Sequence, residues 1–253
     1  MTCIVSDDDH GRFYIEDLSS NNVVHTNPPI SSEISSGRCL VMVSDDAERT
    51  MCTNLGISTE FKTTDLDEDV IKASNYLFLE GYLVASPKGM EVCEKAIEIA
   101  KGSGTKVSIS LSDPNIVNAF KEEIKTLLNM KCDLIFCNED EALAYSEKDD
   151  ILDAVQTFKE LSPNFLITQG SSGCLGFDGK NEFNIPGIKV KAIDSNGAGD
   201  MFAGAVLYCI TTGSSLEKGA IFGCYAASKV VGNVGPRLIK NAYQEIKNNF
   251  PSY

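Results

Sequence analysis

The sequence predicts an α/β fold in which a mostly parallel sheet is covered by helices on both faces. From about residue 76 onward, short apolar runs alternate with amphipathic stretches at the spacing of strands and helices. Polar turns follow several of these runs, as expected where parallel strands end. Hydrophobic residues make up 43% of the 253 residues and charged residues 23%, so the chain has the composition of a globular protein and not of a disordered one.

Four apolar runs are typical of strands in the middle of such a sheet. A parallel strand is buried on both faces and therefore reads as a continuous apolar segment. The runs lie at residues 76–79, 107–111, 134–137 and 165–168. A further strand is expected at residues 190–193. Residues 175–185 predict a hairpin with its turn at Asp178-Gly179.

The stretches between and after the strands have apolar residues at helical spacing. Asp113-Pro114 is expected to start one of these helices. The other predicted helices lie around residues 93–100 and at 151–161, 198–210, 215–231 and 237–249. The first seventy residues are richer in short strands, and roughly residues 20–60 are expected to include lid-type strands. We expect residues 1–253 to form a single domain with this small β lid.

The charge balance argues against binding to nucleic acids or to membrane surfaces. Twenty-two basic and 36 acidic residues give a net charge of −14, which repels nucleic-acid backbones and anionic membrane surfaces. The most apolar stretch, residues 201–210, is too short to span a bilayer. The partners expected are therefore small molecules, with no nucleic acid and no membrane.

The cysteines predict a reducing compartment. There are nine, no two of them form a CxxC pair, and several lie inside apolar runs where a thiol packs as a small hydrophobic group. Residues 1–12 lack the basic start and the apolar stretch of a signal peptide. We expect a cytoplasmic protein with free thiols.

The segment DSNGAGD at residues 194–200 carries the strongest chemical signal. Small residues between a strand and a helix allow backbone N–H groups to converge on an anion at the positive end of the helix. Asp200 would lie in the first turn of that helix, where a carboxylate can take a proton from an attacking hydroxyl. The alternative is a close-packed turn in which Asp200 only favours the helix dipole.

Two weaker signals follow neighbouring strands. Asn138-Glu139-Asp140-Glu141 comes directly after residues 134–137 and offers oxygen atoms that suit Mg²⁺, although a capped helix start is the favoured explanation for this segment taken alone. The segment TQGSSG at residues 168–173 follows the next strand and offers a hydroxyl and glycine amides to a nucleotide phosphate. Because parallel strands end at one edge of a sheet, the three turns support one another.

Other classes of enzyme lack their motifs. The chain contains neither GxxxxGK[ST] nor the GxGxxG dinucleotide fingerprint. His10 and His25 are its only histidines, and neither follows a core strand, which argues against a serine-hydrolase triad or a histidine metal cluster.

Together these three motifs, in this order and spacing, resemble the ribokinase/PfkB family of carbohydrate and purine kinases. Residues 194–200 resemble its DTxGAGD signature, Asn138 and Glu141 its NxxE motif, and residues 168–173 its TxGxxG turn. Within the family the likeness is greatest to adenosine kinases and extends from about residue 4 to 240. The resemblance implies a ribokinase-like three-layer sandwich.

The resemblance also implies roles for individual residues. Asp200 would be the base that deprotonates the substrate, and Gly197, Ala198 and Gly199 would form an anion hole. Asn138 and Glu141 would position Mg²⁺ through water. The residues expected to bind ATP are Thr168, Gly170 and Gly173.

The resemblance suggests roles for three further residues. For two of them, Arg49 and Tyr82, a purely structural explanation is the alternative. Asp194 resembles the carboxylate that helps to hold a monovalent cation such as K⁺ in many members. Arg49 resembles the arginine that approaches the transferring phosphate, or it is an exposed ion-pairing residue. Tyr82 is expected to stack on a substrate purine, or to be a core tyrosine.

One departure from the family concerns the amino-terminal region. Members carry additional residues before the point that matches residues 4–12, and these supply a core strand, an aspartate and a GG…N motif for the acceptor. On this basis the chain is expected to be a shortened form of the family fold.

The sequence thus predicts an ATP-dependent kinase that phosphorylates the primary hydroxyl of a nucleoside, adenosine first, or of a sugar such as ribose or fructose, in purine salvage. The alternative is a non-catalytic nucleotide-binding or regulatory relative with an incomplete acceptor site. Either a monomer or a homodimer is compatible with the sequence.

Overall fold

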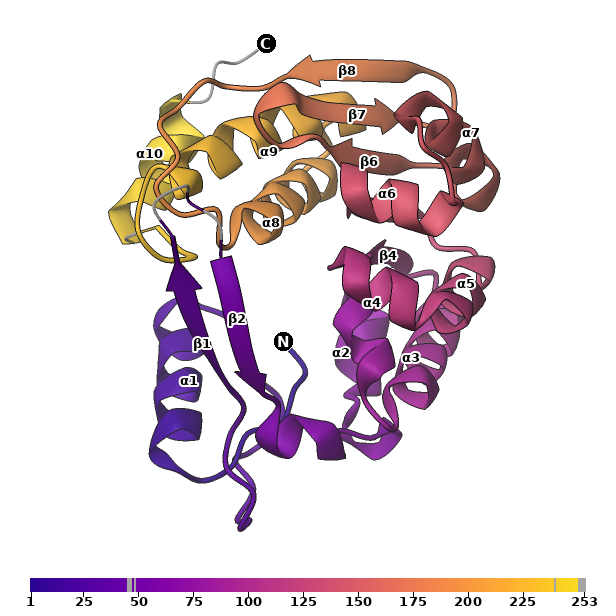
Figure 1. The fold of residues 1–253 in the computed structure, drawn as a ribbon. Coiled ribbons are helices and arrows are strands. Elements are labelled where there is room, and N and C mark those ends of the chain that lie inside the picture. Colours follow the sequence, from indigo (N-terminus) through magenta and orange to yellow (C-terminus); the bar gives the residue numbers. More distant parts are fainter. Residues whose placement is uncertain (45–46, 48, 239, 250–253) are drawn as a thin grey trace.

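The computed structural model describes residues 1–44, 47, 49–238 and 240–249. Its described part contains a six-stranded sheet with the order β3-β4-β5-β6-β7-β8 (Figure 1). The first four strands are parallel, and β7 and β8 are antiparallel. The strands are β3 (Tyr76–Glu80), β4 (Lys106–Ser110), β5 (Leu134–Asn138), β6 (Phe165–Thr168), β7 (Gly173–Phe177) and β8 (Glu182–Pro186). The predicted α/β fold with a mostly parallel sheet is therefore confirmed.

Helices α3 to α7 cover one face of the sheet, and their core cluster includes residues of β3 to β7 (Figure 1). Their apolar sides pack with residues such as Ile109, Ile135 and Ile167 of the strands into the largest core cluster. Fully buried Phe158 packs against Phe165 at 5.8 Å between ring centroids. The helices are α3 (Gly89–Ser103), α4 (Pro114–Ala119), α5 (Lys121–Asn129), α6 (Glu139–Ser146) and α7 (Ile151–Leu161), and the shorter α2 (Glu68–Ala73) packs beside α3.

The opposite face is covered by α8 (Ala198–Thr211) and α9 (Leu216–Val231). Gly223 permits a close approach of the two helices, because a Cβ there would lie 2.7 Å from the ring of Phe202. A third cluster lies on the outer side of this pair and includes Ile246 of α10 (Lys240–Asn249). Helices on both faces make the three-layer arrangement that the sequence predicted.

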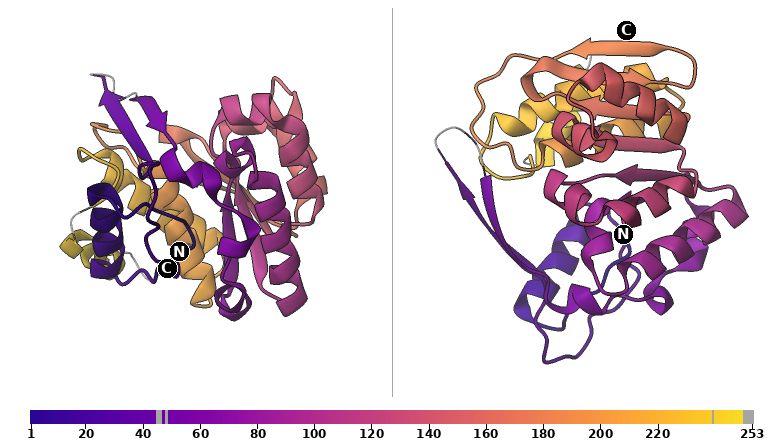
Figure 2. Two further views of the ribbon diagram at one scale, coloured as in Figure 1. Left: turned by 90° about the horizontal axis from the view of Figure 1, so that it is seen from below. Right: turned by 45° about the vertical axis from the view of Figure 1, so that its right-hand side comes forward.

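The amino-terminal part stands beside this sandwich (Figure 2). It contains α1 (Asp9–Ser20) and a two-stranded antiparallel sheet of β1 (Arg38–Val43) and β2 (Arg49–Asn54). This hairpin lies within the range expected to hold lid-type strands. Short 3₁₀ turns follow at Gly56–Glu60 and Thr63–Asp65, with others at Gly81–Ala85 and Gly170–Ser172.

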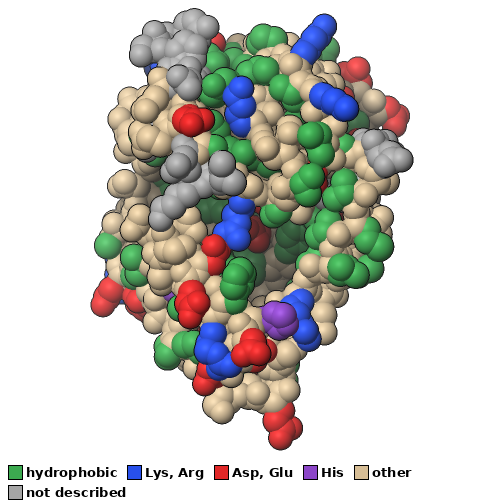
Figure 3. Space-filling view, turned by 90° about the vertical axis from the view of Figure 1, so that its left-hand side faces the viewer, with side chains coloured by type: hydrophobic (Ala, Val, Ile, Leu, Met, Phe, Trp, Pro, Cys, Tyr) green, Lys and Arg blue, Asp and Glu red, His purple; other side chains and the backbone are tan. Residues whose placement is uncertain are grey.

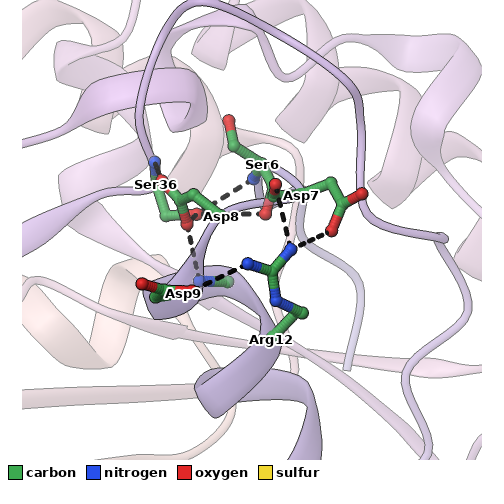
Figure 4. Close-up of polar contacts among 7 residues, drawn as sticks. Ser6, Asp7, Asp8, Asp9, Arg12 and Ser36 are labelled. Atoms are coloured by element: carbon green, nitrogen blue, oxygen red, sulfur yellow. Dashed lines mark hydrogen bonds and ion pairs between the residues drawn. The ribbon is translucent and has the colours of Figure 1, made fainter.

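Asp8 joins α1 to the loop that precedes β1 (Figure 4). Its carboxylate accepts hydrogen bonds from the Gly11 backbone N–H at 2.8 Å, the Ser36 hydroxyl at 2.7 Å and the Ser36 backbone N–H at 2.8 Å. These bonds lower the pKa of Asp8 to about 2, because they stabilise the charged form. Arg12 pairs with Asp7 and Asp9 on the exposed surface nearby, where such pairs contribute little.

The structure corrects three local predictions. Residues 190–193 form no strand: Val190 and Ile193 are 43% exposed, and the Ile193 N–H donates to the Val231 carbonyl at the end of α9 instead of to a strand. Helix α1 was not predicted, since its signal is the Asp8 cap and not a broad apolar stripe. The helix after Asp113 is interrupted at Phe120.

All nine cysteines are free, as the sequence predicted. Burial raises the pKa of Cys93 to about 12 and that of Cys132 to about 11, so these thiols are packing groups and not nucleophiles. Within the described ranges, no helix is both long enough and apolar enough to cross a membrane.

Candidate active site

The segment of residues 194–200 leads directly into the first turn of α8. Gly197 occupies the N-cap position with φ +77°, a backbone conformation that side chains disfavour, and no side chain caps the helix in the described structure. The backbone N–H groups of the first turn of a helix point toward its positive end and favour an anion there. Gly197, Ala198 and Gly199 lie at this end of α8, and their role as an anion hole stays a prediction.

The buried side chain of Asp194 fixes the backbone of this segment through hydrogen bonds. Its side chain is only 2% exposed, and its two oxygens accept hydrogen bonds from the backbone N–H groups of Asn196 at 2.9 Å and Gly235 at 2.8 Å. Both oxygens are therefore already engaged with the protein. The geometry gives Asp194 a structural role, and its role toward a monovalent cation stays a prediction.

The turn after α9 packs against the same segment. A Cβ at Gly197 would lie 2.3 Å from the carbonyl oxygen of Pro236, so the two backbones touch at a position that only glycine permits. From the other side, the Ser195 N–H donates to the carbonyl of buried Ala47 at 3.3 Å. Ala47 lies between β1 and β2, so the hairpin contacts the predicted anion-binding segment directly.

Asp200 is exposed in the first turn of α8, and Glu80 at the end of β3 is near enough for the two charges to interact. Although the Glu80 side chain reaches solvent, partial burial and the like charge of Asp200 raise the pKa of its carboxyl. The sequence did not single out Glu80 as a site residue. Its signal was an acidic residue directly after a buried strand, at the edge where ligands bind.

Asn138 and Glu141 form a reciprocal capping box at the start of α6. The Glu141 N–H donates to Asn138 Oδ1 at 2.8 Å, and the Glu141 carboxylate accepts from the Asn138 N–H at 3.0 Å and from Asn138 Nδ2 at 2.8 Å. Glu141 is 4% exposed. The two side chains are thus bonded to each other, and their role toward Mg²⁺ stays a prediction.

The turn after β6 is tied to the start of α6. The Gln169 side chain donates to Glu139 Oε2 at 3.1 Å, and the Thr168 hydroxyl donates to the Cys137 carbonyl at 3.5 Å. Gly170 is exposed with φ +53°, whereas Gly173 is buried with φ +109°. The structure thus places the second and third motifs side by side at the carboxyl ends of β5 and β6.

Two further predicted residues, Tyr82 and Arg49, lie outside the three motifs described above. Tyr82 follows β3, is 46% exposed and donates from its hydroxyl to the Ser112 carbonyl at 3.3 Å, so it is not a core tyrosine. Arg49 is the first residue of β2, but its side chain lies outside the described part of the structure. In the ranges that the structure describes, no group of three or more His, Cys, Asp or Glu side chains could hold a metal ion.

The face that carries the hairpin, α1 and α10 is hollowed (Figure 3). Apolar side chains lie inside the hollow, and acidic and basic side chains lie around it. A cavity of about 340 Å³ begins at Asp200 on the outer side of α8. The space beside the candidate base is thus open to a small molecule.

Comparisons with protein families, with curated proteins and with solved structures all point to the same family of kinases. The pfkB family carbohydrate kinase model matches residues 1–241. Adenosine kinase of Schizosaccharomyces pombe is 26% identical over 225 residues, which cover 80% of this chain and 64% of that enzyme. The chain therefore spans a little less than two thirds of that relative's length.

Two solved structures show the same fold. The structure of adenosine kinase from Sinorhizobium meliloti has a TM-score of 0.93 at 28% identity and covers 97% of this chain and 76% of its own. A structure from E. coli, described as a ribokinase II in complex with ATP and Mg²⁺, has a TM-score of 0.87 at 19% identity, and covers 97% of this chain and 80% of its own. The second likeness concerns the fold alone.

Proposed function

This chain belongs to the pfkB family of carbohydrate kinases, and on that premise we propose that it transfers the γ-phosphoryl group of ATP to the primary hydroxyl of a nucleoside, adenosine first. The observation that carries the proposal is the position of Asp200. Its carboxylate lies in the first turn of α8, directly after the small residues 197–199 at the positive end of the helix. A base and an anion-binding site are thus adjacent.

In this proposal Asp200 accepts the proton of the acceptor hydroxyl as its oxygen attacks the γ-phosphorus. The bond between that phosphorus and the leaving oxygen breaks, and ADP departs. The backbone N–H groups of residues 197–199 stabilise the negative charge on the phosphoryl oxygens. Asp194 and Pro236 act indirectly: they contact the segment of residues 194–200 and so fix the position of these N–H groups.

The nucleotide would lie across the turns after β5 and β6. Thr168, Gly170 and Gly173 would meet its phosphates, and Asn138 and Glu141 would hold Mg²⁺ through water. Mg²⁺, when bound, neutralises charge on the phosphates and orients them. The capping box and the Gln169 to Glu139 bond support this, since they fix both turns before a nucleotide arrives.

A sugar such as ribose or fructose is the second candidate acceptor, since the matching family model is one of carbohydrate kinases. A non-catalytic nucleotide-binding or regulatory role is the candidate from another class. We also propose that the chain forms a single domain and acts in the cytoplasm.

The test is ADP release from Mg²⁺-ATP with adenosine, ribose and fructose supplied separately. We expect turnover with adenosine, a loss of about 10²–10⁴-fold in Asp200→Asn, and unchanged ATP affinity in that variant. Retained turnover in Asp200→Asn would refute the base assignment. Saturable ATP binding without turnover of any acceptor would favour the non-catalytic role.

A further inference from the structure

The amino-terminal part, residues 1–65, contacts the predicted anion-binding segment at one point and the turn that supports this segment at another. At the first point, the Ser195 N–H donates to the Ala47 carbonyl at 3.3 Å. At the second point, Asp17 of α1 forms an ion pair with Arg237, which is 220 residues further along the chain. These two contacts between described residues therefore lie at the same end of α8.

Arg237 belongs to the turn after α9 that packs against the first turn of α8. Its neighbour Pro236 lies so close to Gly197 that a Cβ there would be 2.3 Å from the Pro236 carbonyl oxygen. Gly235, one residue earlier, donates its backbone N–H at 2.8 Å to the buried carboxylate at the start of the predicted anion-binding segment. The position of this turn therefore affects residues 197–199, whose N–H groups are proposed to face the phosphoryl group.

Helix α1 presents Asp17 to this turn from a partly buried position. The side chain of Asp17 is 22% exposed, and that of Arg237 is 58% exposed. Tyr14 lies on the same face of α1, three residues before Asp17. Burial and neighbouring Cys3 raise the pKa of its phenol to about 12, and the charges of Glu80 and Arg237 also act on it. This face of α1 therefore lies near both the end of β3 and the turn after α9.

We propose that Arg237 is a positioning residue: its ion pair with Asp17 holds the turn after α9 against Gly197 and so places the first turn of α8 for phosphoryl transfer. This inference rests on the proposed function and deepens it, because it makes α1 part of the support of the site. An ion pair as exposed as this one contributes little to the global stability of a chain. Its effect is therefore on the geometry of the site, where a displacement of about 1 Å can lower a rate by about 10²-fold.

The experiment compares Asp17→Asn, Arg237→Gln and the double variant in ADP release from Mg²⁺-ATP with adenosine. Each single substitution should lower kcat by about 10- to 100-fold and leave the KM for ATP unchanged, since only the transition state depends on the exact position of the N–H groups. The double variant should lose no more than either single variant, because both substitutions break the same ion pair. Arg237→Lys keeps the charge and should retain most of the kcat that Arg237→Gln loses.

Lys121→Gln is the matched control. Lys121 also forms an ion pair, with Glu147 at 2.7 Å, but it does so in the helix layer on the opposite face of the sheet from α8. Its substitution should leave kcat unchanged. A loss of kcat in Arg237→Gln without a loss in Asp17→Asn would show that the arginine acts without its partner and would overturn the inference. An equal loss in Lys121→Gln would overturn it as well.

A second measurement does not depend on activity. Hydrogen–deuterium exchange of a peptide that contains residues 194–200 follows the N–H groups of Ser195 and Asn196, which are both hydrogen-bonded. Exchange in this peptide should be severalfold faster in the two single variants and unchanged in the control.

The two measurements separate the inference from the proposed function. Faster exchange in a protein that transfers no phosphate would keep the link between α1 and this segment and refute the kinase. Turnover of adenosine with unchanged kcat and unchanged exchange in Asp17→Asn and Arg237→Gln would refute the link and keep the kinase. Faster exchange with an unchanged kcat would overturn the positioning role.

Discussion

The buried carboxylate of Asp194 accepts a hydrogen bond of 2.8 Å from the backbone N–H of Gly235, 41 residues further along the chain. Its other oxygen accepts from Asn196 within the predicted anion-binding segment. One side chain therefore fixes that segment to the turn after α9, which also packs against Gly197 through Pro236.

Asp194→Asn should lower the free energy of unfolding by about 1–3 kcal/mol, because an amide can accept only one of the two bonds and leaves a buried donor unpaired. Urea unfolding measures the change. Asp178→Asn is the control, since Asp178 also accepts two backbone N–H bonds but is exposed, and it should change stability by less than about 1 kcal/mol. If the two substitutions change the free energy of unfolding equally, the buried bonds of Asp194 do not stabilise the chain more than exposed ones do.

Gly197→Ala should destabilise the chain by more than about 1–2 kcal/mol, the approximate cost of a left-handed backbone at a residue with a Cβ. The overlap with the Pro236 carbonyl adds to that cost. Gly199→Ala provides the comparison, because its Cβ would meet no atom within 4 Å and its φ is not positive. If thermal unfolding shows the two variants to be alike, the contact between Gly197 and Pro236 is not a constraint.

Asp8 should make stability depend on acid. The pKa of its carboxyl is about 2 in the folded chain against 3.8 ordinarily, so its contribution is present above about pH 4 and is lost as the pH falls through 2. Asp8→Asn should be less stable at pH 7 and lose less stability between pH 4 and 2 than the unchanged chain. Asp9→Asn, whose side chain is 97% exposed, should behave like the unchanged chain in the same circular-dichroism titration.

Glu80→Gln should raise the melting temperature at pH 7. The pKa of Glu80 is raised above 4.5 by burial and by Asp200, so its charged form opposes folding at neutral pH. The difference from the unchanged chain should shrink as the pH falls toward 4.5, because protonation then removes the same charge from Glu80. A difference that stays constant from pH 7 to 4.5 would rule out this electrostatic cause.

The core of the fold was predictable from the sequence because its signals are local. Continuous apolar runs such as residues 134–137 identify buried strands, and Asp178-Gly179 identifies a hairpin turn. Helix α1 was not predicted because its signal is the Asp8 cap and not a broad apolar stripe, and the bonds that join Asp8 to Ser36 span 28 residues of the chain. Residues 190–193 have the apolar pattern of a strand, but no neighbouring strand pairs with them in the described structure.

The sequence by itself determined the chemical groups of the site, because the turns after β5 and β6 and before α8 are contiguous segments whose residue types and spacing can be recognised. Only the tertiary structure decided how these groups are held and what faces them. It joined Asp194 to Gly235, brought Glu80 near Asp200, and opened a cavity between α8, α9 and α10. The physical reason is that such contacts depend on how helices and strands pack together, and residue spacing along the chain does not encode those distances.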